Sequence, residues 1–189
     1  LTDKGPMWLT VPVHGSIEKR IDEIEIVQNR WQMQHYQAIR TNYSKTPYFS
    51  AVKSFLEDVY LCHQWQNLSE LNQYLIKTIS SEFLDIKTEF GFSSSYHSEG
   101  SGHMKLFSLV KNTGAKIYES GPAAKSYLEA EDYAKAGIEL IWKDYTGYPE
   151  YPQMFTPFEH KVSILDLLCN TGPDAKYYIW GWREKDHHP

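Results

Sequence analysis

The chain has 189 residues and a formal net charge of −5, with 41% hydrophobic and 15% aromatic residues. The length suits one well-buried α/β domain, and the negative charge with scattered basic residues argues against nucleic acid or an anionic membrane surface as a partner. No apolar run approaches the roughly 20 residues of a membrane span, and the pattern of a signal peptide is missing.

The first half of the chain predicts two strands and then three helices. Residues 7–13 (MWLTVPV) and 22–27 (DEIEIV) alternate in hydrophobicity as strands do. Helices are predicted after Asn29, after Thr46 and after Asn67 or Ser69, each with an apolar stripe at helical spacing. The chain starts at Leu1, just before the first predicted strand, so we expect further sequence upstream.

The second half predicts alternating strands and helices. Strands are expected at 86–92 (IKTEFGF), 115–118 and 138–142 (IELIW), with helices at 104–112 and 131–136. Gly114 and Gly137 stand where glycines end helices. This alternation is typical of a parallel sheet with right-handed crossovers. We therefore predict one α/β domain over residues 1–189, a mostly parallel sheet flanked by helices, with a helical insertion near 31–84.

The cysteine content indicates the redox compartment. Cys62 and Cys169 are the only cysteines, and each falls inside an apolar pattern of helical spacing. Two isolated cysteines provide neither a disulfide framework nor a metal-site spacing. We interpret both as buried thiols in a reducing compartment, which predicts a cytoplasmic location. A nucleophilic Cys169 is the minor alternative.

Three polar clusters follow the predicted strands of the second half, at 93–103, 119–125 and 145–153. Ligands of open parallel sheets bind beyond the carboxyl ends of the strands, so these clusters predict a site. The first cluster is more simply a solvated loop. In the second, Lys125 follows the Ser120–Gly121 turn, where it either holds a phosphate or carboxylate or is an ordinary surface lysine.

The stretch from Gly147 to Gly172 is the most informative part of the chain. Its prolines, aromatic rings and amides indicate an ordered segment that forms a binding wall. Ser163-x-x-Asp166 within it resembles a capping box, with Asp in place of Glu or Gln. Capping is the preferred interpretation of both residues over an acid–base pair of His160 with Asp166, although Asp166 could do both.

Common catalytic and nucleotide motifs are missing. The chain contains no GxGxxG, Walker or GxSxG pattern, which argues against the usual nucleotide fingerprints and against serine-hydrolase chemistry. His14, His35 and His63 lie too far apart in sequence to define a ligand set, so no metal site is predicted.

Several blocks resemble the WbqC-like protein family. They are WLTVPV at 8–13, YSKTPYF at 43–49, SELNQYLIKTI at 69–79, GAKIYESGPAAKSYL at 114–128, GIELIWKDY at 137–145 and YPEYPQMFTPFEHKVSILDLLCNTG at 148–172. The blocks cover nearly the whole chain in order, and the last is the most specific. Members of that family are bacterial and occur in gene clusters for O-antigen and other surface polysaccharides. Their usual opening, H/Q-P-x-x-F/Y-x-P-x-x-G-Y-F, is missing here, in line with the expected upstream sequence.

The resemblance implies a transferase that places an acyl or aminoacyl group, such as glycine, on a nucleotide-linked amino sugar. The family's opening is similar to that of HIGH-type nucleotidyltransferases, which implies a Rossmann-like sheet. The alternatives are a non-catalytic module that binds a nucleotide sugar or a partner, and a HIGH-like nucleotidyltransferase. The small-molecule substrate would be a nucleotide sugar or an aminoacyl donor, while cofactor and oligomeric state stay open.

The residues that we assign to this site fall into three groups. They are an anion clamp (Ser120, Gly121 and Lys125), a group that positions the acceptor (Tyr148, Tyr151 and Gln153), and catalytic side chains (His160 as the base, and Glu150).

Overall fold

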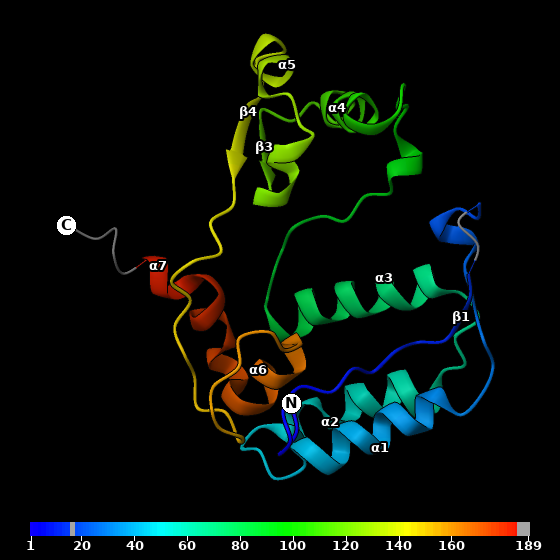
Figure 1. The fold of residues 1–189 in the computed structure, drawn as a ribbon, viewed down its shortest axis with the longest axis vertical. Helices are drawn as coiled ribbons and strands as arrows, with labels where there is room; N and C mark the ends of the chain where they lie inside the picture. The colour runs from blue at the N-terminus through cyan, green and yellow to red at the C-terminus, as the bar shows by residue number, and fades with distance from the viewer. Residues whose placement is uncertain (16–17, 185–189) are drawn as a thin grey trace. The chain divides into compact units, whose positions relative to one another are not determined.

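The computed structural model describes residues 1–15 and 18–184, which form two compact units (Figure 1). The first unit combines residues 1–87 with the segment from Tyr148 onward, and the second consists of residues 88–147. Helices predominate in a mixed α/β fold with small sheets. The organisation of residues 1–189 as a single domain stays a prediction. In the part of the chain that is described, no helix has both the length and the apolar character of a membrane span.

The first unit is mainly helical. Its elements are β1 (Val13–His14), β2 (Glu25–Ile26), α1 (Trp31–Tyr43), α2 (Phe49–Glu57), α3 (Leu68–Thr78), α6 (Ile164–Thr171) and the short α7 (Trp182–Glu184). Five-residue π-helical turns follow α2 and α3, at Asp58–Cys62 and Ile79–Phe83, and a third lies at Tyr177–Gly181. Single 3₁₀ turns occupy Ile21–Glu23 and Gly172–Asp174.

The three predicted helices of the first half are confirmed, and local side-chain hydrogen bonds mark the beginning of α1 and α3. Asn29 Oδ1 accepts a hydrogen bond from the Trp31 N–H at 2.8 Å, beside the first residue of α1. Asn67 is the N-cap of α3 and accepts from the backbone N–H groups of Ser69 and Glu70 at 2.8 and 3.1 Å. Such caps satisfy the free N–H groups of a first turn.

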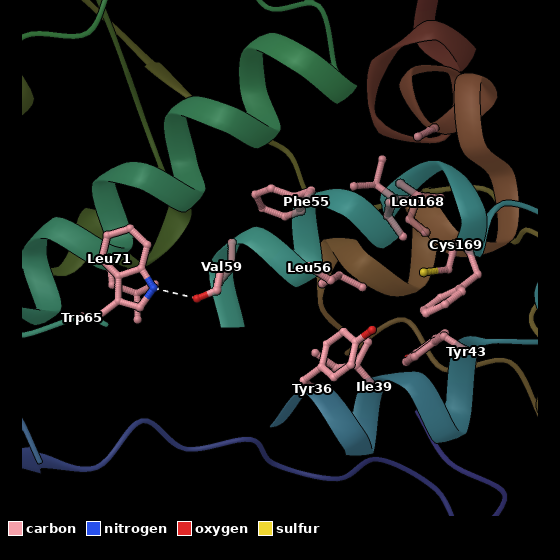
Figure 2. Packing of buried hydrophobic residues seen from close by; sticks show 14 of the residues in the cluster. Tyr36, Ile39, Tyr43, Phe55, Leu56, Val59, Trp65, Leu71, Leu168 and Cys169 are labelled. Atoms are coloured by element: carbon pink, nitrogen blue, oxygen red, sulfur yellow. Dashed lines mark hydrogen bonds between the residues drawn. The ribbon is translucent and has the colours of Figure 1, made fainter. Parts of the chain in front are cut away.

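The core of the first unit gathers apolar side chains from α1, α2, α3 and α6 (Figure 2). Val52, Leu56, Leu168 and Cys169 are each at most 2% exposed. Burial of such side chains stabilises a fold by about 1.5–3 kcal/mol each, so α6 is held by residues that lie more than 100 positions earlier. The Trp65 indole Nε1–H is also buried, and it donates to the Val59 carbonyl at 2.8 Å.

The two strands predicted in the first half are much shorter than expected. Only Val13–His14 and Glu25–Ile26 pair, antiparallel, with Val13 opposite Ile26. The backbone N–H of Ile26 donates to the carbonyl of Gln66, which lies just before α3. The second segment is therefore held by the residues before α3 as well as by its pairing with β1. Residues 7–10 are exposed and form no strand, although their sequence alternates.

The second unit contains a strand–helix–strand arrangement. Its elements are a 3₁₀ turn (Ser93–Ser95), α4 (Gly102–Asn112), β3 (Ile117–Ser120), a 3₁₀ turn (Pro122–Ser126), α5 (Ala130–Lys135) and β4 (Glu139–Trp142). β3 and β4 are parallel, in register from Ile117↔Glu139 to Ser120↔Trp142, which confirms the predicted parallel pairing of these two strands. Val110, Tyr133 and Ile138 form its small core.

The strand predicted at residues 86–92 is wrong. These residues form no helix or strand, and Phe90 and Phe92 are 46% and 50% exposed. A strand requires a partner for its backbone groups, and residues 86–92 have no pairing partner among the described residues. The described sheet of this unit is therefore one parallel pair, β3 and β4.

Candidate functional site

Asp166 lies at the centre of a buried polar cluster in the first unit. Its side chain is in α6 and the residue is only 1% exposed. Oδ1 accepts a hydrogen bond from the Tyr43 hydroxyl at 2.9 Å. Oδ2 accepts from the Tyr151 hydroxyl at 2.7 Å and from Gln153 Nε2 at 2.8 Å. Three stretches of chain that are distant in sequence therefore meet at one carboxylate.

The capping-box interpretation of Ser163 and Asp166 is wrong. Ser163 is the N-cap residue of α6, but its side chain makes no capping hydrogen bond. The Asp166 carboxylate instead receives two phenol hydroxyls and an amide. A buried carboxylate requires such donors, and one of them, Tyr43, lies 123 residues away. A local sequence pattern carries no sign of that partner.

Gln153 gives the 148–163 segment much of its order. Its Nε2 also donates to the Glu159 carbonyl at 2.9 Å, and its Oε1 accepts from the Glu159 N–H at 2.8 Å. The Tyr151 ring packs edge-on against Phe158 and Tyr178, with centroids 5.0 and 5.5 Å apart. Polar and aromatic contacts together tie this loop to Asp166.

Burial sets the protonation of the two phenols. Desolvation, together with the adjacent Asp166 charge and hydrogen bond, raises the pKa of both Tyr43 and Tyr151 above the ordinary tyrosine value. Both hydroxyls are therefore protonated at neutral pH. This agrees with their role as donors to Asp166.

The two cysteines differ. Cys169 is fully buried, as predicted, and burial raises its thiol pKa to about 12, which argues against a nucleophilic role. Cys62 is exposed, so the prediction of a buried thiol is wrong there. Cys62 belongs to the π-helical turn after α2, in which only Val59 is buried.

A pocket of about 430 Å³ opens beside the Asp166 cluster. Tyr43 belongs to both the pocket wall and the cluster. The volume is in the usual range for small-molecule sites, and the lining is largely apolar with a few polar groups. Residues of the N-terminal segment, of α1 and of the approach to α6 line it: Leu1, Thr2, Pro6, Met7, Trp8, Leu9, Ala38, Ile39, Asn42, Tyr43, Lys161, Val162, Ser163 and Leu165.

Of the predicted site residues in the first unit, two contact Asp166 and three do not. Tyr151 and Gln153 meet at Asp166. Tyr148 instead packs against Trp182, at a centroid distance of 5.9 Å. Glu150 and His160 are exposed, and no hydrogen bond or ion pair joins them to the Asp166 cluster among the described residues.

The remaining predicted residues lie in the second unit, at the carboxyl ends of β3 and β4. Ser120 ends β3, and its carbonyl accepts from the Lys143 N–H at 2.8 Å. Lys125 Nζ lies 5.5 Å from the centre of the Trp142 ring. A Cβ at Gly121 would lie 3.7 Å from the Tyr145 hydroxyl. The structure thus brings the 119–125 cluster next to Trp142 and Tyr145. The 93–103 cluster does not follow a strand, because residues 86–92 form none.

The second unit also holds a His–Asp pair that sequence reasoning missed. His103 Nε2 lies 2.9 Å from Asp132 Oδ2, and the His103 side chain is 13% exposed. The pair joins α4 to α5, and the imidazole packs against Phe107 and Tyr133. Within residues 1–15 and 18–184, no group of three or more His, Cys, Asp or Glu side chains is placed to hold a metal ion.

The chain is similar to known proteins over most of its length. The profile of the WbqC-like protein family matches residues 1–178. The uncharacterized protein Rv1507c of Mycobacterium tuberculosis (strain ATCC 25618 / H37Rv) is 37% identical over 180 residues, which cover 94% of this chain and 78% of that protein. No solved structure matches the chain significantly.

Proposed function

Because the chain belongs to the WbqC-like protein family, we propose that it transfers an acyl or aminoacyl group, such as glycine, to a nucleotide-linked amino sugar in the synthesis of O-antigen or another surface polysaccharide. The observation that carries this proposal is the pocket of the first unit, whose wall includes Tyr43, a residue that a buried carboxylate holds in place through its hydroxyl. Group transfer depends on polar groups that are fixed before the substrate binds.

The Asp166 cluster supplies such fixed groups. Tyr43 and Gln153 are each held by more than one element of the fold, because Asp166 joins α1 to the 148–163 segment. The apolar part of the wall would shield one side of a sugar from water, and the polar groups would orient it. In this proposal Tyr148, Tyr151 and Gln153 position the acceptor, directly or through Asp166.

Two further groups complete the proposed chemistry. His160 is the general base, with Glu150 as the second catalytic side chain. The exposed imidazole of His160 directly precedes Lys161, which lines the pocket. Within the second unit, Ser120, Gly121 and Lys125 would hold an anionic group, and their position at the end of β3 supports this, since ligands of open parallel sheets bind beyond the carboxyl ends of the strands.

A non-catalytic binding module is the second candidate. The positions of Glu150 and His160 favour it, because both proposed catalytic side chains are exposed and no hydrogen bond or ion pair joins them to the Asp166 cluster among the described residues. The module would recognise the same nucleotide sugar in the same pocket. Both candidates therefore predict that the protein binds a nucleotide sugar, and only the transferase predicts that it converts the sugar to a product.

A two-stage experiment separates these functions. The first stage measures melting temperatures of the natural full-length protein with nucleotides, nucleotide sugars and amino acids, because a specific ligand stabilises by mass action; ATP or CTP with magnesium is the arm for nucleotidyl transfer. The second stage incubates the stabilising sugar with acyl thioesters, or with glycine and ATP, and follows product by mass spectrometry. An acylated sugar supports the transferase, and binding without product supports the module. No stabilisation by any nucleotide sugar contradicts both.

The base assignment has its own test. We expect His160→Ala to abolish transfer and to leave the melting temperature nearly unchanged, because the side chain is exposed. A loss of folding in this variant would assign His160 a structural role.

A further inference from the structure

We infer that the first unit carries a further binding site, which takes a free α-amino acid with an apolar side chain. The site is a pocket of about 390 Å³ that is lined by α2, the π-helical turn after α3, and the end of α6. None of its lining residues belongs to the pocket beside Asp166, so this site lies outside the proposed function and does not depend on it. Its inner wall is apolar, and its other lining residues carry charges of both signs.

The inner wall of this pocket is apolar. Val52 of α2 and Leu168 of α6 line it and are only 1% and 2% exposed, and Phe83 adds an aromatic ring. The volume is within the usual range for small-molecule sites. An aliphatic side chain that enters the pocket exchanges water for contact with these residues, and the removal of its apolar surface from water favours binding. The wall therefore favours a ligand with an apolar portion.

Lys176 is the cation that this pocket offers to a ligand. Its Nζ lies 3.7 Å from Oδ2 of Asp85, which also lines the pocket. Asp85 has a closer partner, because Lys87 Nζ lies 2.5 Å from its Oδ1. In the same order, Lys87 lowers the pKa of Asp85 more than Lys176 does. The flexible stem of a lysine lets Lys176 turn to a carboxylate in the pocket, and Asp85 would keep Lys87 as its partner.

Glu82 is the anion that the pocket offers. Its carboxylate is exposed and makes no ion pair with any residue in the described ranges, so it is available to an ammonium group. At neutral pH a free α-amino acid carries an ammonium, a carboxylate and a side chain. With an apolar side chain it matches Glu82, Lys176 and the inner wall together. An alkylamine or an aliphatic carboxylate matches only two of these three.

Titration of the wild-type protein with four ligands, followed by two-dimensional NMR at about pH 6.5, tests these matches. At this pH an α-amino group is cationic. The ligands are leucine, glycine, leucinamide, which lacks the carboxylate, and 4-methylpentanoate, which lacks the ammonium. We expect leucine to bind at least about tenfold more tightly than glycine, because its side chain is buried. It should bind about threefold more tightly than the other two, because each loses one ion pair.

Two variants assign the two charged ends of the ligand. Lys176→Gln should bring the affinities for leucine and leucinamide close together and keep the preference for leucine over 4-methylpentanoate. Glu82→Gln should do the reverse. Lys53→Gln is the matched control, because Lys53 is also a partly exposed lysine that pairs with a carboxylate, 3.6 Å from Glu57, but does not line the pocket. This control should keep both preferences.

The same spectra locate the ligand and decide the outcome without any variant. Leucine should shift the backbone amide resonances of Val52, Leu168 and Gly172, which belong to the pocket lining. The inference is overturned if leucine up to about 10 mM shifts none of them, if it shifts the lining of the other pocket instead, or if it binds no more tightly than glycine. Preferences that survive in Lys176→Gln and Glu82→Gln, or that are lost equally in Lys53→Gln, would also overturn it.

Nucleotide sugars separate this site from the proposed function. If leucine binds at this pocket and no nucleotide sugar stabilises the protein, the inference stands and the proposed function is wrong. If a nucleotide sugar binds in the pocket beside Asp166 and leucine shifts no resonance, the inference is wrong and the proposed function stands.

Discussion

Replacing Asp166 with asparagine tests whether the buried carboxylate organises the candidate site. The substitution keeps the size and shape of the side chain and removes its charge. In the structure Asp166 is 1% exposed and accepts three hydrogen bonds, from Tyr43, Tyr151 and Gln153. Asparagine has one acceptor oxygen, so its amide nitrogen must face at least one of these donors.

The expected cost follows from these three contacts. A hydrogen bond to a charged group contributes about 1.5–3 kcal/mol and a neutral one about 0.5–1.5 kcal/mol, so three bonds lose about 3 kcal/mol together. A donor that faces the new NH₂ group adds to this loss unless it turns to accept. The lower desolvation cost of a neutral amide offsets part of the sum. We expect Asp166→Asn to lower the free energy of unfolding by about 1–3 kcal/mol.

The least strained arrangement also changes the pocket. If the new oxygen keeps Tyr151 and Gln153, the new NH₂ group faces Tyr43, which must then accept the bond. The Tyr43 proton would turn away from residue 166, so a residue that lines the pocket would change its hydrogen bonding. Asp166→Asn should therefore also weaken the binding of whichever nucleotide sugar stabilises the wild-type protein, and the ligand-induced shift in melting temperature measures this.

Urea unfolding, followed by fluorescence and circular dichroism, measures the stability change. Asp174→Asn is the control, because Asp174 is exposed and surface substitutions usually change stability by less than about 0.5 kcal/mol. If Asp166→Asn changed the free energy of unfolding by less than about 0.5 kcal/mol, with the same slope against urea concentration as the wild type, the charged network would not stabilise this unit. An increased stability would show that desolvation of the charge outweighs its hydrogen bonds.

Two further predictions follow from burial. The raised pKa values of Tyr43 and Tyr151 mean that folding favours their protonated forms, so their contribution to stability is complete below about pH 10 and is lost as the pH rises further. Tyrosinate absorbance during an alkaline titration should show these phenols ionising only with unfolding, and early ionisation of all tyrosines would contradict this. For the cysteines, a thiol reagent should label Cys62 in the native protein and Cys169 only in denaturant. Native labelling that persists in Cys62→Ser would show that Cys169 is accessible.

Local patterns in the sequence determined the helices and the parallel crossover. The stripe of α1 and the Asn67 cap of α3 act within a few residues, so spacing alone reveals them. Gly114 and Gly137 follow α4 and α5 with φ of 74° and 72°, a conformation that glycine adopts at no steric cost. The strand at 86–92 was predicted wrongly because a strand also needs a partner, and pairing is not a local property.

The sequence also pointed to the 147–172 stretch and to the WbqC-like family, because composition and residue order are enough for both. Only the tertiary structure decided what Asp166 does. A capping box is judged from four consecutive residues, whereas the carboxylate is satisfied by Tyr43, 123 residues earlier in the chain. The same holds for the pocket, whose wall combines the N-terminal segment, α1 and the approach to α6. Burial creates the need for such distant partners, and only the fold brings them to one point.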